Sequence, residues 1–232
     1  MSPAKNNRIP NRLLATLPKK DYQELLPHLQ EVPLNFGEIL YNPQDVVNDV
    51  YFPNAGIISL VAGAKEQTSL EVGMVGNEGM VGINVFLGVN TSPNRGVVQG
   101  TGSALRMKAP ALLRATRNGG ALSRVLQRYT HSVMTQITQS AVCNQFHSID
   151  ARLARWLLMT QDRMADDEFQ VTQNFLSHML GVRREGVSIA AGELQRAKLI
   201  TYSRGRLKVL DRKGLEAASC DCYEYVRKES LR

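Results

Sequence analysis

The chain has 232 residues, of which 43% are hydrophobic and 21% charged, which excludes a disordered chain and leaves room for two moderate domains with packed cores. Its formal net charge of +7 favours an anionic partner, either nucleic acid or an acidic membrane surface. Three cysteines give no disulfide framework, and no apolar run approaches the roughly 20 residues needed to span a bilayer. Because the stretch MSPAKNNRIPNRLL also lacks a signal-peptide pattern, we expect a cytoplasmic protein without a membrane partner.

The first half of the chain predicts a short helical region followed by strands. Helical spacing at residues 13–28 is broken at Pro18 and Pro27, and short apolar runs punctuated by Gly, Pro and Asn then fill residues 32–108. Turn signals at intervals of roughly ten residues favour an antiparallel barrel or roll. The four histidines all lie outside these strands, and no phosphate-binding loop or zinc spacing is present, so we expect no enzyme activity.

Residues 121–145 predict one long helix with an apolar stripe. This stripe either packs on the preceding roll or pairs with a second copy as a coiled-coil seam. Its members are Leu122, Leu126, Tyr129, Val133 and Ile137. The next helix is expected at residues 149–164 after an N-cap at Ser148, with Arg152, Arg155 and Arg163 lying off its buried stripe.

The segment FLSHMLGVRREGVSIAAGEL predicts two short helices joined by a tight turn. Thr172 is placed to cap a helix that runs to Leu180, and Gly181 follows where a left-handed residue ends a helix. A second helix over residues 183–198 would bury Val187 and Leu194. Two helices joined by a glycine turn are the helix-turn-helix unit of DNA-binding proteins.

Burial of that apolar face turns a charged face outward, at the positions that enter the DNA major groove. The expected base-reading residues are Arg184, Glu185, Ser188 and Ile189. Residues 199–210 then predict a basic β-hairpin, or wing, whose side chains would meet phosphates. The expected phosphate contacts are Thr172, Gln173, Arg183, Ser203, Arg204, Arg206 and Lys208. Residues 172–213 hold nine basic and three acidic residues, a net +6 of the chain's +7, which concentrates the positive charge here.

These residues resemble the winged helix of the cyclic-AMP receptor protein and fumarate–nitrate regulator (Crp/Fnr) superfamily. The motif is LGVRREGVS, and the stretches FGEILY and DVYFPNAGIISL look like the superfamily's β-roll. The resemblance implies an α+β fold with an N-terminal antiparallel jelly roll resembling a cyclic-nucleotide-binding domain, a long central dimerisation helix and a C-terminal winged helix-turn-helix. The expected domains are a sensor at residues 1–120, the central helix at 121–146 and the DNA-binding domain at 147–232.

The resemblance also implies partners. They are double-stranded DNA with a two-fold symmetric operator, a second copy of the chain as a homodimer, RNA polymerase, and a small effector in the roll. Gly82, Ile83 and Arg95 mark the expected effector pocket. Cyclic-nucleotide binders carry glutamate after that glycine and Ser or Thr after the arginine, whereas Ile83 and Gly96 stand here, which argues against cyclic AMP.

The cysteines argue against a cysteine-ligated iron–sulfur cluster of the superfamily's type. Such clusters need four cysteine ligands, mostly near the N-terminus, whereas the first cysteine here is Cys143. We expect Cys143 to pack within the long helix and predict no metal site, although Cys220 and Cys222 leave a redox or metal role open. The alternative to a DNA-binding regulator is a ligand-binding or protein-docking β-roll that does not bind DNA.

Overall fold

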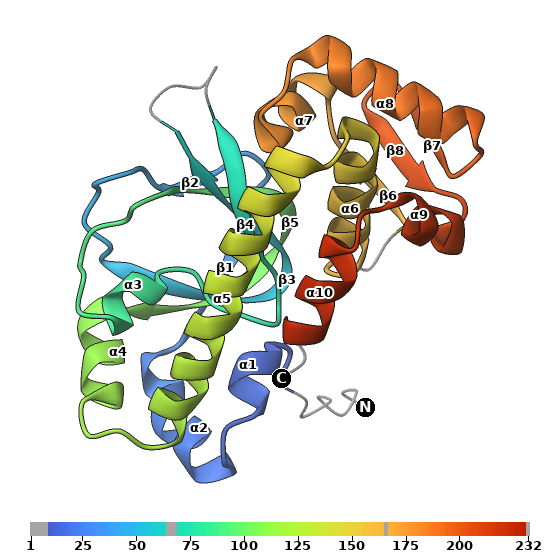
Figure 1. Cartoon of the computed structure of the whole chain (residues 1–232). Helices are drawn as coiled ribbons and strands as arrows, with labels where there is room; N and C mark the ends of the chain where they lie inside the picture. Colours follow the sequence, from blue (N-terminus) through green and yellow to red (C-terminus); the bar gives the residue numbers. More distant parts are fainter. Residues whose placement is uncertain (1–8, 64–68, 165–166, 231–232) are drawn as a thin grey trace.

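The computed structural model describes residues 9–63, 69–164 and 167–230, so part of the N-terminal stretch considered above, residues 1–8, lies outside it. Figure 1 shows a β-roll on one side, a group of C-terminal helices on the other, and the long helix α5 (Ala121–Phe146) running between them. Of the helices in the described ranges, none combines the length and apolar character needed to cross a bilayer.

The β-roll is antiparallel throughout, as the turn-punctuated strands predicted. Its strands follow the order β1-β5-β3-β4, and β2 also pairs with β5. The long pair β3 and β5 changes register near Gly56, where φ is +88° and a Cβ would lie 2.5 Å from the Gly100 carbonyl oxygen. Glycine therefore permits the bend that curls the sheet. The strands are β1 (Gln30–Leu34), β2 (Ile39–Tyr41), β3 (Asp49–Ala62), β4 (Leu70–Val75) and β5 (Arg95–Lys108).

Short helices close the roll. Pro18 precedes α2 and Pro27 lies in η1, so both prolines interrupt the N-terminal helical region as expected. The buried Asn11 side chain caps α1 and donates to the carbonyl oxygens of Pro53 and Gly79, which ties α1 to the roll. These helices are α1 (Arg12–Ala15), α2 (Lys19–Leu25), η1 (Leu26–His28), α3 (Ile83–Phe86) and α4 (Ala109–Thr116).

Helix α5 uses its two halves differently, and this bears on the expected dimer seam. Leu122 and Leu126 are buried in the core of their own roll, and the Tyr129 hydroxyl donates to the Met80 carbonyl oxygen at 2.8 Å. Leu122 and Leu126 are thus covered by their own chain, whereas Tyr129 is half-buried. Val133 is half-buried, and only Ile137 of the five expected seam residues is exposed.

A second core lies among the C-terminal helices, and it buries two arginines that we expected at the surface. Helix α6 (Ile149–Gln161) is shorter than expected and carries Leu153, Trp156 and Leu157 into this core. Arg152 and Arg155 are also buried, because Arg152 donates to the Leu180 carbonyl oxygen and Arg155 faces α5. Arg163 has a buried side chain as well.

The remaining elements form a winged helix-turn-helix. Strands β6, β8 and β7 make a three-stranded antiparallel sheet beside the helix pair α7 and α8. Figure 1 shows α10 returning along α5. The elements are β6 (Glu168–Gln170), α7 (Gln173–Leu180), α8 (Arg184–Arg196), β7 (Ile200–Ser203), β8 (Arg206–Val209), α9 (Arg212–Ala218) and α10 (Cys222–Ser230).

The roll and the C-terminal helices share buried contacts. Ile57, Val61 and Met74 of the roll belong to the same core as α6, α7 and α8. At the edge of this contact, the largely buried Arg163 donates from Nε to Glu78 at 2.7 Å. The roll and the helix pair are therefore joined by packed side chains rather than by a free linker.

The turn between α7 and α8 gives a prediction with an internal control. Gly181 has φ +62° and a Cβ there would lie 3.0 Å from Leu70, so Gly181→Ala should lower the free energy of unfolding by about 1–2 kcal/mol. Gly192, inside α8 with no atom near the Cβ position, is the control, because Gly192→Ala should raise it by about 0.5–1 kcal/mol.

Urea denaturation measures the free energy of unfolding of both variants. The fluorescence of Trp156, the single tryptophan, reports on the C-terminal core against which the two helices pack. Equal effects of the two substitutions would contradict the turn geometry.

Candidate nucleic-acid interface

The turn between α7 and α8 is fixed at both ends of α7. The Thr172 hydroxyl accepts the Phe175 amide at 3.1 Å and so caps the helix start, as expected. At the other end Gly181 takes the left-handed conformation, and its amide and that of Val182 both bond the Ser177 carbonyl oxygen. Arg183 is the N-cap residue of the next helix. The direction of α8 relative to α7 is thereby set by local hydrogen bonds.

Helix α8 divides into a buried and an exposed face. Val187, Ala190, Ala191 and Leu194 are buried. The four expected base-reading residues, Arg184, Glu185, Ser188 and Ile189, are all exposed on the opposite face. Ile189 is 66% exposed, although burial of so apolar a side chain is usually favourable. An apolar side chain held open among charges is suited to contact a partner surface.

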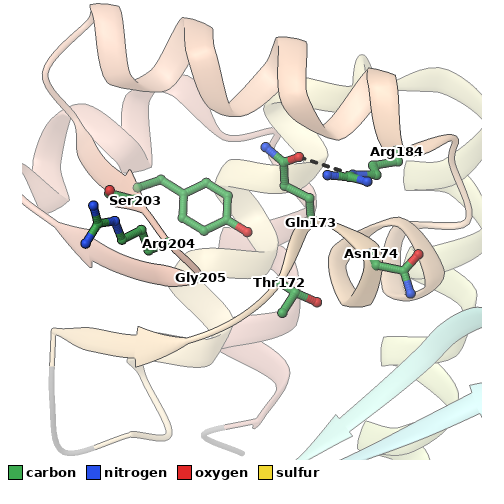
Figure 2. Close-up of a pocket in the computed structure, with 8 residues that line it drawn as sticks. Thr172, Gln173, Asn174, Arg184, Ser203, Arg204 and Gly205 are labelled. Carbon is green, nitrogen blue, oxygen red and sulfur yellow. Dashed lines mark hydrogen bonds between the residues drawn. The ribbon is translucent and has the colours of Figure 1, made fainter.

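Gln173, the first residue of α7, organises this exposed face. Its Oε1 accepts the Ser188 hydroxyl at 2.9 Å and lies 3.5 Å from the Arg184 Nε. Figure 2 shows Gln173 and Arg184 pointing toward one another across a hollow. One amide oxygen therefore contacts two of the expected base-reading side chains.

The wing closes the other side of the hollow. Arg204 and Gly205 both have positive φ, at 52° and 77°, which is typical of a two-residue hairpin turn. The Val171 amide bonds the Gly205 carbonyl oxygen at 2.8 Å, and the Tyr202 hydroxyl donates to the Val171 carbonyl oxygen at 2.8 Å. The wing is thus fixed to the segment that precedes α7.

The hollow between α7, α8 and the wing has a volume of about 500 Å³. It is lined by Thr172, Gln173, Asn174, Arg184, Tyr202, Ser203, Arg204 and Gly205 (Figure 2). Asn174, Tyr202 and Gly205 were not among the expected contacts. Asn174 could have been predicted from the sequence, because it lies in the first turn of α7, close to the expected contact Thr172.

The charges around the hollow are mostly uncompensated. In the described residues no ion pair is formed by Arg183, Arg184, Arg204 or Lys208. Arg206 lies 3.8 Å from Glu168, whereas Arg196 pairs with Glu193 along α8. These unpaired cations give the surface its net attraction for an anion.

Arg212 does not belong to this positive surface. It is 2.6 Å from Asp162 and 3.0 Å from Glu216, and it also donates to Gln161 and Tyr223. It joins α9 to the end of α6 instead.

The buried side chain of Tyr41 packs near the expected effector residues. The ring of Tyr41 lies against Gly96, the residue after Arg95, and a Cβ at Gly96 would be 3.0 Å from that ring. The hydroxyl of Tyr41 is hydrogen-bonded to the backbone of Gly82. Tyr41 is buried, and burial raises the pKa of its hydroxyl. Tyr41 therefore packs against Gly96 and the Gly82 backbone, and the effector pocket at Gly82, Ile83 and Arg95 stays a prediction.

Comparison with known protein families gives a match to the C-terminal part of the chain. Residues 151–218 match the family described as the Crp-like helix-turn-helix domain. Among curated protein sequences none matches this chain.

Solved structures share the fold of nearly the whole chain. A Crp/Fnr family regulator from Eubacterium rectale is 15% identical with a TM-score of 0.71, covering 89% of this chain and 97% of its own. FixK2 from Bradyrhizobium japonicum is 15% identical with a TM-score of 0.70, covering 83% and 98%. The c-di-GMP responsive regulator CLP from Xanthomonas campestris is 17% identical with a TM-score of 0.66, covering 83% and 99%.

The position of Tyr41 predicts the response to cyclic nucleotides. Cyclic AMP and cyclic GMP should leave the Tm unchanged, because the Tyr41 side chain occupies part of the roll near Gly82. If either nucleotide did bind, a concentration of 100 times its Kd would stabilise the folded state by about 2.7 kcal/mol, and the Tm would rise measurably. Differential scanning fluorimetry of the full chain, with linear AMP as the control, measures this. A rise in Tm that depends on the concentration of the cyclic form alone would show that Tyr41 moves aside.

Proposed function

We propose that this chain is a homodimeric, sequence-specific DNA-binding transcriptional regulator. Residues 151–218 match the Crp-like helix-turn-helix domain, and the chain shares the fold of Crp/Fnr regulators over more than four fifths of its length. The observation that carries the proposal is the exposed N-terminal face of α8, where Arg184, Glu185, Ser188 and Ile189 stand clear of the protein core. An electrophoretic mobility shift with DNA upstream of its own gene tests it, and no shift at low salt would favour a β-roll module without DNA binding.

Base reading is assigned to the four exposed residues of α8. Arginine can bond guanine through two nitrogens, and glutamate can accept from the amino group of cytosine. Ile189 can contact a thymine methyl group. Gln173 supports this assignment, because it holds Arg184 and Ser188 in one orientation and so reduces the entropy lost on binding.

Phosphate contacts are assigned to the residues that surround α8. Arg183, Arg204 and Lys208 are exposed cations, and Thr172, Gln173 and Ser203 border the same hollow. Arg206 belongs to this set but must exchange Glu168 for a phosphate. Such contacts fix the register of the protein on the duplex without reading its sequence.

Dimerisation is assigned to the C-terminal half of α5. Met134, Ile137 and Val142 are exposed there, and Phe146 at the end of the helix is 76% exposed. Met134, Ile137 and Ala141 follow the three-and-four spacing of a coiled-coil seam. They are exposed, unlike Leu122 and Leu126, which pack on the roll.

Effector control and contact with RNA polymerase belong to the same proposal. Residues 1–120 would act as the sensor, residues 121–146 as the dimer helix and residues 147–232 as the DNA-binding domain. An effector would act by binding better to one arrangement of the two α8 helices than to another.

The two classes of DNA contact predict different outcomes on substitution. Arg184→Ala should weaken binding at the specific site by about 1–3 kcal/mol and reduce the preference for it over random DNA. Arg204→Ala should weaken binding to both DNAs alike and reduce the salt slope by about one unit. Fluorescence anisotropy across a salt series measures both effects. If both variants lost the same degree of preference, the assignment of the contacts would be wrong.

The proposed seam predicts the oligomeric state. Ile137→Glu should convert the dimer to a monomer, because a buried charge opposite its twin is strongly unfavourable. Leu113→Glu is the matched control, since Leu113 is an exposed apolar residue of α4. Sedimentation equilibrium gives the mass of each variant. A dimer that survives Ile137→Glu unchanged would exclude this face of α5.

A further inference from the structure

Four side chains that commonly bind metal ions meet where the end of α5 faces the start of α10. Cys143 and His147 lie one helical turn apart at the end of α5, and Cys220 and Cys222 flank the start of α10. The three Sγ atoms and a ring nitrogen of His147 all lie within 4.8 Å of one another. Two elements far apart in the sequence thus contribute two ligand-type residues each.

Two of the distances between these atoms match those around a single ion. Sγ of Cys143 is 3.5 Å from Sγ of Cys220, and Sγ of Cys222 is 3.5 Å from Nδ1 of His147. Four ligands at about 2.0–2.3 Å around a tetrahedral ion lie roughly 3.3–3.8 Å apart. A disulfide requires sulfurs about 2.05 Å apart, and an iron–sulfur cluster holds its cysteines apart by its own width.

The cysteines are buried, His147 is half-buried, and the surroundings are positively charged. Cys143 and Cys222 are each 1% exposed, and the Gln139 amide donates to Sγ of Cys222 at 3.1 Å. The buried Arg152 and Arg155 form no ion pair within the described ranges, and the Nε atom of each has no hydrogen-bond partner there. A divalent ion with three thiolates and a neutral histidine carries a net charge of −1, which these guanidinium groups would compensate.

We propose that Cys143, His147, Cys220 and Cys222 bind one Zn²⁺ ion per chain in a closed tetrahedral Cys3His site. Thiolate and imidazole ligands favour zinc among the common divalent ions, and four protein ligands leave no open position for catalysis. The ion holds α10 on α5. Arg152, which packs beside the cluster, also donates to the Leu180 carbonyl oxygen at the end of α7, so the site is connected to the helix-turn-helix.

Metal titration of the full chain tests the site without reference to DNA. Metal-free protein titrated with Co²⁺ should develop the d–d and thiolate charge-transfer bands of a tetrahedral thiolate site at one ion per chain, and Zn²⁺ should displace it. Cys143→Ser and His147→Asn should each weaken Co²⁺ binding by on the order of 100-fold or more. His28→Asn, an exposed histidine of η1, is the control and should bind as the parent chain does.

Native mass spectrometry of the unmodified chain keeps the test independent of variant folding. One Zn²⁺ per chain, with all three thiols accounted for as ligands, supports the site. A metal-free chain under zinc excess, or a Cys143–Cys220 disulfide in its place under reducing conditions, overturns it.

The consequence for DNA rests on the proposed function and is measured separately. Zinc-loaded protein should bind its operator more tightly than the metal-free chain, and this difference should vanish in Cys143→Ser. Failure of Arg184→Ala to change base preference would overturn the regulator proposal alone, whereas failure to bind Co²⁺ or Zn²⁺ would overturn the metal site alone.

Discussion

The left-handed turn at Gly181 is the constraint on which the candidate interface depends. Because the amides of Gly181 and Val182 both close on the Ser177 carbonyl oxygen, α8 leaves α7 in one direction. In that direction the apolar side of α8, with Val187 and Leu194, must enter the core. Its charged N-terminal side is then exposed by geometry, and the rigid wing places further cations beside it. Every contact proposed with DNA follows from how this one turn orients a helix.

The turn does not stand alone, because it rests on the β-roll. A Cβ at Gly181 would touch Leu70 of β4, and Ile57 and Met74 of the roll share a core with α6 and α8. Helix α5 extends this connection, since its first half packs in the roll and its last turn meets α10 at the cysteine cluster. The sensor, the dimer helix and the DNA-reading helix proposed for this chain are therefore one packed network, through which a two-state rearrangement could be transmitted.

Local signals in the sequence were sufficient for the helix-turn-helix. A capping threonine, a glycine after the last apolar residue and a three-and-four pattern each act within a few residues, so Thr172, Gly181 and the faces of α8 could be predicted. Features set by distant residues could not. An apolar stripe does not reveal what covers it, which is why Leu122 and Leu126 were assigned to a dimer. Arg152 and Arg155 are buried by partners on α5 and α7, and Tyr41 packs against residues on two other segments. The Cys–x3–His spacing at 143–147 was a visible local signal, but Cys143 and Cys220 are 77 residues apart and only the fold brings them together.

In vitro selection from random duplex DNA is the most direct measurement of the central claim, because it assumes no operator. If the exposed face of α8 reads bases in a dimer, the selected sequences should be inverted repeats whose half-sites lie about one turn of DNA, ~34 Å, apart. They should also lose their consensus when Arg184 is replaced by alanine. Selection that yields no enriched sequence at low salt, or the same consensus from the Arg184→Ala chain, would contradict the account.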